Sequence, residues 1–446
     1  MKRVVWSTLV LLLLSQGSCR EKAPGEPPPA PPLNGPVLLH QSVKKLTDVI
    51  VYDVFTPPVA SRIYAYASLA AYEAVRHEGA RPSASITAQL NGFADMPLPE
   101  KGKSYLFALA GVKAMMTVGQ QLTFSKDTLR QYEQALYQQL EASGAVDGET
   151  LRRSVAFGQQ IGLRILDRAS RDQYKETRGM SRYSVARKAG YWEPTTPDYM
   201  DAVEPFWGKI EVLAMDSARQ FRPEPPVPFS LDKKSPFWIE LTEVYELSKT
   251  LTEEQKEIAR FWDCNPFVSE HTGHLTSASK KMTPGGHWMA IAGLAAQQTN
   301  ASLIKTAQTY ALTAVALFDG FISCWEEKFR SQTVRPVTLI NQYIDRRWEP
   351  YLQTPPFPEY TSGHSVISAS AATVLTHLYG DSLAFRDTTE LEYGMGERSF
   401  TSFYQASDEA GVSRIYGGIH YRTTCVRGAE QGRKVGKWIV DRVRVQ

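Results

Sequence analysis

The chain has 446 residues, of which 43% are apolar and 22% are charged, and its formal net charge is +3. This composition is ordinary for a folded globular protein, and a chain of this length can bury a large core. The near-neutral charge and the lack of a basic stripe argue against nucleic acid as a partner.

The first residues predict export. Residues 1–19 hold two basic residues, an apolar run too short to span a bilayer, and then small residues before Cys19. The Gly-Ser-Cys ending indicates a bacterial lipoprotein cleavage site with Cys19 lipidated. Ordinary secretion is the alternative, because Gln16 stands where an aliphatic residue is usual. Residues 20–36 are rich in proline and predict an extended tether, so contact with a membrane is expected only through the anchor on Cys19.

Helical periodicity dominates the rest of the chain and predicts an all-α fold. Apolar residues recur at helical spacing in five segments: 61–77, 103–122, 126–143, 148–170 and 302–329. A turn-rich stretch at about 171–236 separates an N-terminal helical region (37–236) from a C-terminal helical region (237–446). We expect this stretch to wrap over the helices without separating independent domains.

The C-terminal region contains six polar residues suited to binding an oxyanion. They lie in three blocks, KFRSQTVRP (328–336), TSGH (361–364) and SRIYGGIH (413–420), and are Lys328, Arg335, Ser362, His364, Arg414 and His420. Their cations offset an anion's charge, and arginine binds pairs of oxygens in a fixed geometry. The blocks therefore predict one oxyanion-binding site.

Local spacing predicts how two of these blocks are held. Lys328 and Arg335 are two helical turns apart, so they share a face if the segment is helical, and the following proline places Arg335 at a helix end, reaching outward. Residues 364–379 have helical periodicity. This places Ser362 and Gly363 at a helix N-terminus, where free N–H groups favour an anion.

The third block predicts a last helix. Two glycines precede His420, which is expected to open a helix running to about Val443. Arg414 is expected in the loop that leads into this helix.

The three blocks resemble the vanadium-dependent haloperoxidases of the chloroperoxidase type and their relatives, the acid and lipid-phosphate phosphatases. The shared pattern is K-x6-RP, then PSGH, then SR-x5-H, and the resemblance extends over about residues 260–440. It implies an all-α helical bundle of this type with vanadate as cofactor. Phosphate can occupy the same site.

The resemblance also implies a role for each residue. His420 would bond the metal and His364 would act as acid/base. The oxygens would be held by Lys328, Arg335, Ser362, the Gly363 N–H and Arg414. Trp325 and Phe357 stand where chloroperoxidase-like members line a halide pocket, although both could simply be core aromatics.

Two positions depart from the family pattern. Thr361 replaces the proline before Ser-Gly-His. Thr424 stands four residues after His420, where the phosphatases and several haloperoxidases carry an aspartate that orients the histidine. The missing carboxylate argues against a phosphatase.

Three functions remain open at this point. The first is a haloperoxidase that oxidises halide with hydrogen peroxide to hypohalous acid. The second is an acid phosphatase of phosphate esters, with His420 as nucleophile and His364 as general acid. The third is a non-catalytic, anion-binding envelope lipoprotein. The sequence does not determine the halide, the organic acceptor or the oligomeric state.

The other histidines and cysteines predict no metal site. His271, His274 and His287 lack the spacing of a zinc motif and are expected to be structural or to lie at the rim of the pocket. The remaining cysteines (Cys264, Cys324 and Cys425) are too far apart for a metal cluster. They are expected to be buried thiols, with one disulfide possible in an oxidising compartment.

Overall fold

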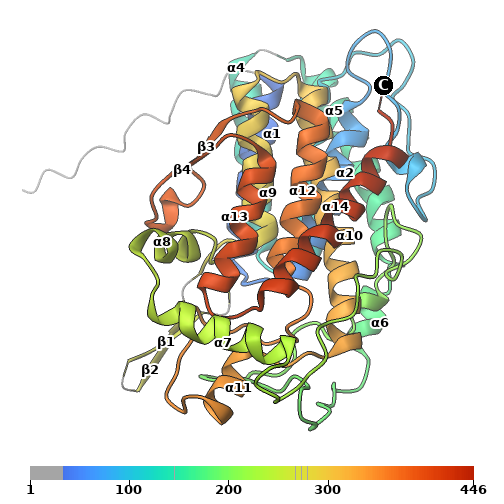
Figure 1. The fold of residues 1–446 in the computed structure, drawn as a ribbon. Coiled ribbons are helices and arrows are strands. Elements are labelled where there is room, and N and C mark those ends of the chain that lie inside the picture. Colours follow the sequence, from blue (N-terminus) through green and yellow to red (C-terminus); the bar gives the residue numbers. More distant parts are fainter. Residues whose placement is uncertain (1–33, 145, 267, 273, 279, 446) are drawn as a thin grey trace, which may run out of the picture.

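The computed structural model describes residues 34–446 except 145, 267, 273, 279 and 446, and there the chain forms a bundle of helices (Figure 1). The predicted signal segment and nearly all of the predicted tether lie outside the described residues. No helix in the described part is long and apolar enough to cross a membrane.

The helices follow one another with few strands between them, so the all-α prediction is confirmed. The N-terminal helices are α1 (Gly35–Tyr52), α2 (Pro57–Val75), α3 (Phe107–Leu122), α4 (Lys126–Ser143), α5 (Gly148–Ala169) and α6 (Tyr174–Arg178). The C-terminal helices are α7 (Pro236–Lys249), α8 (Glu253–Phe261), α9 (Pro284–Gln298), α10 (Leu303–Ser331), α11 (Pro336–Tyr343), α12 (Gly363–Tyr379), α13 (Phe403–Tyr416) and α14 (Arg422–Arg442).

Short elements complete the fold. They are the 3₁₀ turns η1 (Thr87–Gln89), η2 (Trp207–Lys209) and η3 (Leu391–Tyr393), and the antiparallel pairs β1 (Ser269–Thr272) with β2 (Leu275–Ala278) and β3 (Phe385–Asp387) with β4 (Arg398–Phe400). The five segments predicted from periodicity correspond to α2, α3, α4, α5 and α10, with ends that differ by a few residues.

Helix α10 runs through the centre of the bundle and is buried along most of its length. It packs against α2 on one side and α12 on the other, so helices of both predicted regions share one hydrophobic core. Small residues permit the close packing: a Cβ on Gly320 would lie 3.2 Å from the Ser370 hydroxyl oxygen. The helix ends where Gln332 adopts a left-handed φ of 51°, and this turn directs the chain toward Arg335.

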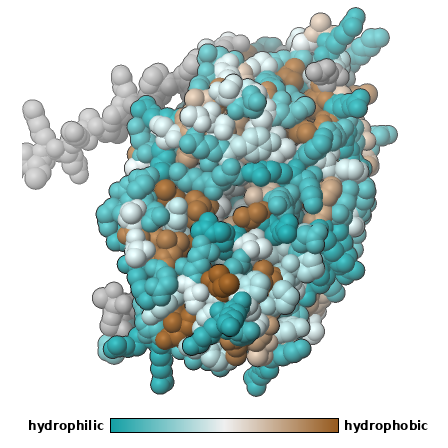
Figure 2. Space-filling model, in the orientation of Figure 1, coloured by the Kyte–Doolittle hydropathy of each residue, from teal (hydrophilic) through white to brown (hydrophobic). Residues whose placement is uncertain are grey.

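A buried carboxylate on α10 holds part of the turn-rich stretch (171–236) against the helices by hydrogen bonds. Asp319 accepts hydrogen bonds from the backbone N–H groups of Leu213, Ala214 and Met215 at 2.8, 2.8 and 2.9 Å. Burial raises the pKa of Asp319, and these three donors oppose that rise. The stretch therefore packs onto the helices, as the sequence predicted. Figure 2 shows polar side chains over most of one face of the molecule, with apolar side chains only in small groups.

Candidate active site

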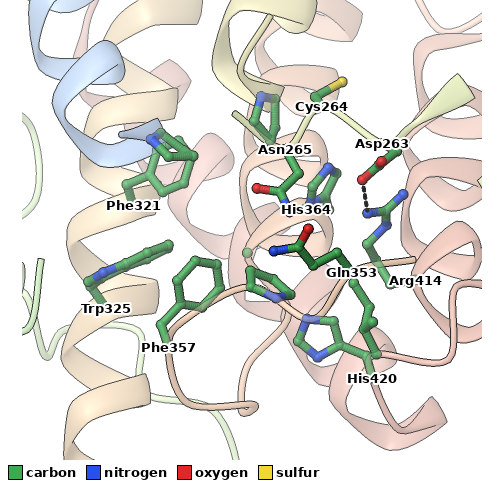
Figure 3. Close-up of a pocket in the computed structure, with 15 residues that line it drawn as sticks. Asp263, Cys264, Asn265, Phe321, Trp325, Gln353, Phe357, His364, Arg414 and His420 are labelled. Atoms are coloured by element: carbon green, nitrogen blue, oxygen red, sulfur yellow. Dashed lines mark ion pairs between the residues drawn. The ribbon is translucent and has the colours of Figure 1, made fainter. Parts of the chain in front are cut away.

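The predicted oxyanion residues meet around one cavity. Gly363, His364, Arg414 and His420 line it, together with the predicted aromatics Trp325 and Phe357 (Figure 3). The remaining three predicted residues, Lys328, Arg335 and Ser362, are fully buried. Lys328 lies against Phe357, Arg335 lies against His420, and Ser362 precedes Gly363. The cavity volume open to the centres of water molecules is about 40 Å³. A few water molecules, or the oxygens of a small anion, therefore fit inside.

Lys328 lies in the last turn of α10 and points at the segment before α12. Its ammonium donates to the backbone carbonyls of Pro358 at 2.8 Å and Glu359 at 3.0 Å. An ammonium has three N–H donors, so one remains for another acceptor. Burial lowers the pKa of Lys328 to about 7, and the neighbouring Arg335 adds to this effect.

Arg335 is the residue before α11, in extended geometry, with Pro336 beginning the helix. Its Nε donates to the Phe357 carbonyl at 2.9 Å, and Nη1 donates to the Ile419 carbonyl at 2.8 Å. The prediction of a helix end is confirmed, but the prediction that the side chain reaches outward is wrong. Buried carbonyls hold it inside the protein, and Lys328 belongs to a different helix.

Ser362 caps α12, and Gly363 and His364 begin it, as predicted. The Ser362 hydroxyl oxygen accepts the Ser365 N–H at 3.3 Å. A Cβ at Gly363 would lie 3.5 Å from the Trp325 ring, in ordinary van der Waals contact, so the start of α12 lies directly beside the aromatic side of the cavity. The helix N-terminus therefore presents its free N–H groups beside the cavity.

Arg414 and His420 lie differently from the prediction. Arg414 is in the last turn of α13, and not in a loop, and His420 precedes the first residue of α14 by two positions. Arg414 donates through Nη2 to the Ala259 carbonyl at 3.2 Å, and its Nη1 lies 3.9 Å from a carboxylate oxygen of Asp263. The segment between the two helices turns at Gly418, whose φ is +75°.

His420 is oriented by a carboxylate that the sequence analysis missed. Its Nδ1 is 2.7 Å from Oε1 of Glu359, and that oxygen also accepts the Tyr421 N–H at 3.1 Å. Thr424 donates its hydroxyl to Oε2 of Glu359 at 2.9 Å. The argument that Thr424 removes the carboxylate is therefore wrong, because Glu359 supplies one and Thr424 supports it.

These contacts indicate which nitrogen of His420 lacks a proton, because an arginine Nη can only donate. Nδ1 carries the proton toward Glu359, while Nε2 lies 3.2 Å from Nη1 of Arg335. Burial and the positive charge of Arg335 hold the pKa of His420 well below its usual range, so the imidazole is neutral. A neutral imidazole with a carboxylate on its other nitrogen is the usual form of a metal ligand.

The aromatic residues form one wall of the cavity. The ring centroids of Trp325 and Phe357 are 4.9 Å apart, and Phe321 packs on Trp325 at 5.4 Å. The Lys328 ammonium lies 5.1 Å from the centre of the Phe357 ring. Both predicted aromatics thus line the cavity.

The residues present fit a bound oxyanion. Nη2 of Arg335 and Nε2 of His364 are buried and have no hydrogen-bond partner in the described part of the chain. Burial lowers the pKa of Arg335 to about 10 and also lowers that of Arg414. An anion in the cavity would accept a hydrogen bond from Nη2 of Arg335 and would stabilise the charged forms of both arginines, which burial disfavours.

Comparisons with known proteins agree with this geometry. The family model described as the VCPO second helical-bundle domain matches residues 341–446. The crystal structure of a bacterial vanadium-dependent iodoperoxidase is 45% identical, with a TM-score of 0.85 over 92% of this chain and 97% of that chain.

More distant structures share the fold. The holo form of a bacterial vanadium-dependent chloroperoxidase is 17% identical, with a TM-score of 0.68 over 88% of this chain and 93% of that chain. Its apo form is 18% identical, with a TM-score of 0.67 over 87% of this chain and 94% of that chain. No curated protein sequence gave a match.

The described part of the chain is thus mostly helical and holds a buried group of residues that fits an oxyanion. This group is named the oxyanion cradle, and its members are Lys328, Arg335, Ser362, Gly363, His364, Arg414 and His420. With the 45% identical relative matched over nearly its whole length, the chain belongs to the vanadium-dependent haloperoxidase family. Membership of this family implies a vanadate cofactor.

Proposed function

We propose that the protein is a vanadate-dependent haloperoxidase that uses hydrogen peroxide to oxidise a halide to hypohalous acid. The observation that carries the proposal is the aromatic wall of Trp325 and Phe357 beside the cavity, where a halide could approach. Glu359 orients His420 and leaves its Nε2 unprotonated beside Arg335. In this proposal Nε2 bonds the vanadium. The oxygens are held by Lys328, Arg335, Ser362, the Gly363 N–H and Arg414.

Bound vanadate would supply a redox-inert Lewis acid that activates peroxide toward attack by a halide. The protein's own part is preorganised charge in a dry cavity. The third N–H of Lys328 can donate to a peroxide oxygen, and the fixed Arg335 and Arg414 offset the negative charge. These groups need little rearrangement, because backbone carbonyls already hold all three.

His364 is proposed as the acid/base. Burial and the charge of Arg414 hold the pKa of His364 well below its usual range, so Nε2 is an unprotonated acceptor. An anion in the cavity would oppose the effect of Arg414 and bring this pKa back toward neutrality. General acid–base help of this kind is worth about 10²–10⁴-fold in rate.

Iodide is the halide we propose for this site. The wall of Trp325, Phe357 and Phe321 is apolar and suits a large, weakly hydrated anion. The 45% identical relative is an iodoperoxidase. The predicted export of the chain, with an anchor on Cys19, would release the oxidised halide outside the cytoplasm.

A phosphatase is the second candidate, and one observation favours it. Glu359 gives His420 the carboxylate that a nucleophilic histidine needs. In that case His364 would be the general acid. A non-catalytic anion-binding lipoprotein is the third possibility.

One set of assays separates the three candidates. Protein freed of vanadate is assayed for iodide, bromide and chloride oxidation with peroxide, with and without added vanadate, and for aryl phosphate hydrolysis. We expect halide oxidation only with vanadate, and its loss in His420→Ala but not in His377→Ala, a control on α12 away from the cavity. Phosphate ester turnover without halide oxidation would replace the proposal with the phosphatase, and neither activity would favour the third candidate.

A further inference from the structure

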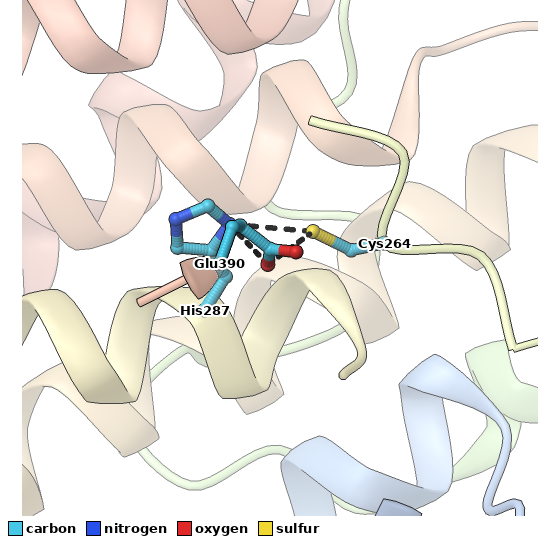
Figure 4. Close-up of side chains that lie close together, drawn as sticks. All are labelled: Cys264, His287 and Glu390. Atoms are coloured by element: carbon cyan, nitrogen blue, oxygen red, sulfur yellow. Dashed lines mark hydrogen bonds and ion pairs between the residues drawn. The ribbon is translucent and has the colours of Figure 1, made fainter. Parts of the chain in front are cut away.

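A second group of polar side chains lies beside the cavity, apart from the oxyanion cradle. Cys264 follows α8, His287 is in the first turn of α9, and Glu390 precedes η3 (Figure 4). Their exposed fractions are 1%, 0% and 3%, so all three are inside the protein. Three separate segments thus bring a thiol, an imidazole and a carboxylate together inside the protein.

The distances between their ligand atoms match a metal site. Cys264 Sγ is 3.3 Å from His287 Nδ1 and 3.8 Å from Glu390 Oε1, and the latter two atoms are 3.4 Å apart. Tetrahedral zinc with ordinary bond lengths places sulfur about 3.6 Å from nitrogen or oxygen, and nitrogen about 3.4 Å from oxygen. The point equidistant from the three atoms lies about 2.0 Å from each, close to Zn–N and Zn–O bond lengths. A small shift of the ion away from the sulfur gives the longer Zn–S bond.

The other side of the imidazole is also arranged as in metal sites. His287 Nε2 is 2.8 Å from Oδ2 of Asp387, which is itself buried. Oδ1 of Asp387 accepts the backbone N–H of Thr389 at 3.0 Å and its hydroxyl at 2.7 Å. The His287 ring stacks on Trp262 with centroids 4.6 Å apart. A carboxylate behind a histidine ligand fixes the tautomer that presents the opposite nitrogen to a metal.

We propose that Cys264, His287 and Glu390 bind a divalent metal ion, with Zn²⁺ as the ion that this donor set fits best. Asp387 is the residue that positions His287. The site differs from the histidine grouping considered in the sequence, since His274 is exposed and takes no part. It does not depend on the proposed haloperoxidase function.

Three protein ligands leave a fourth coordination position. Cys264 also lines the active-site cavity, so a water molecule can reach the ion from that side. The ion would tie the segment after α8 to α9 and to the turn after β3. This fixes the neighbouring Asp263, whose carboxylate faces Arg414 at 3.9 Å.

The first test uses the full chain without any substitution. Vanadate-free protein is stripped with a chelator, titrated with ZnCl₂ or CoCl₂, and its bound metal is measured by mass spectrometry. We expect one equivalent of zinc, and a cobalt form with tetrahedral d–d bands and a thiolate-to-cobalt charge-transfer band. No saturable binding, or a cobalt spectrum without the thiolate band, would overturn the proposal.

Variants locate the ion. Cys264→Ser should remove the charge-transfer band, and Asp387→Asn should weaken zinc binding about 10–100-fold. Cys324→Ser and Glu392→Gln are matched controls that should bind zinc like the unchanged chain, and so should His420→Ala, which tests whether zinc sits in the oxyanion cradle. Circular dichroism checks that each variant is folded. Equal zinc affinity in Cys264→Ser and the controls would contradict the assignment.

Discussion

Replacing Glu359 by glutamine tests whether His420 acts as a metal ligand. Glutamine keeps the shape of the side chain: its oxygen can accept from His420 Nδ1 and the Tyr421 N–H, and its amide can donate to the Thr424 hydroxyl. Only the negative charge is lost. The substitution therefore isolates what the carboxylate contributes to the imidazole.

Two effects of opposite sign follow. Losing a negative charge beside the cavity favours any bound anion, by at most about 4 kcal/mol at an effective dielectric constant of about 20. Losing the carboxylate also makes Nε2 of His420 a weaker electron-pair donor to a metal. Removing such a carboxylate from behind a histidine ligand lowers metal affinity about 10–100-fold, or by about 1.4–2.7 kcal/mol. The absolute affinity for vanadate is therefore a poor measure, because the two effects partly cancel.

The ratio of two anions separates these effects. Vanadate and phosphate have nearly the same shape and feel the lost charge alike, but only vanadate bonds to nitrogen. We expect Glu359→Gln to lower the preference for vanadate over phosphate by about 10–100-fold. Isothermal titration of each anion at pH 8 and constant ionic strength measures both affinities, and at this pH the carboxylate of Glu359, whose pKa burial raises to about 7, is ionised in the unchanged chain.

The matched control is Glu133→Gln, which makes the same change at a buried glutamate on α4, away from the cavity. It should leave the ratio unchanged. An unchanged ratio in Glu359→Gln as well would refute the reasoning, because His420 would then contribute equally to both anions.

Three further predictions concern the other residues around the cavity. His364→Gln should lower kcat about 10²–10⁴-fold while vanadate affinity in titrations changes less than about tenfold, and a larger loss of affinity would make His364 a ligand. Phe357→Leu should raise the KM for halide more than it lowers vanadate affinity. The substitution removes the aromatic ring but keeps the backbone carbonyl of residue 357 that holds Arg335. Equal effects on KM and on vanadate affinity would contradict a halide-binding wall. Burial lowers the pKa of Lys328 from 10.5 to about 7. Between these two pH values the unfolded chain therefore binds more protons than the folded protein. The free energy of unfolding of the anion-free protein, measured with urea, should therefore rise as pH increases from about 7 to 10. Vanadate affinity should fall over the same range as the ammonium is lost, and Lys328→Met should remove both dependences; pH-independent affinity in the unchanged chain would show that Lys328 does not hold the anion.

The sequence predicts the cradle residues because their chemistry is local. A serine and glycine before a helical segment place N–H groups at its start, and this holds for α12 whatever surrounds it. Lys328 and Arg414 are cationic side chains that can attract an anion whatever secondary structure they belong to. Their positions in the fold were harder to predict. Arg414 lies in α13, and the glycines near it had favoured a loop at this position.

Glu359 could not be found by the same reasoning. A search one helical turn after His420 reaches Thr424, whereas the carboxylate comes from 61 residues upstream. It is brought there because Arg335 and Lys328 hold the backbone of residues 357–359 against the cradle. Only its position three residues before Ser362, just ahead of the TSGH block, could have suggested a role.

The second cluster shows the same limit. Cys264, His287 and Glu390 are 23 and 103 residues apart along the chain, so no spacing rule connects them. The sequence instead grouped His287 with histidines near it in number. Packing of α9 against β3, and not sequence proximity, supplies Asp387 and Glu390.

The central claim is that vanadate binds in this cradle through His420. A crystal structure of the chain with vanadate, supported by vanadium X-ray absorption, tests it most directly. We predict vanadium bonded to Nε2 of His420, with its oxygens near Arg335, Arg414 and the start of α12, and loss of the nitrogen ligand in His420→Ala. Vanadium without a nitrogen ligand, or the same absorption spectrum in His420→Ala, would contradict the account.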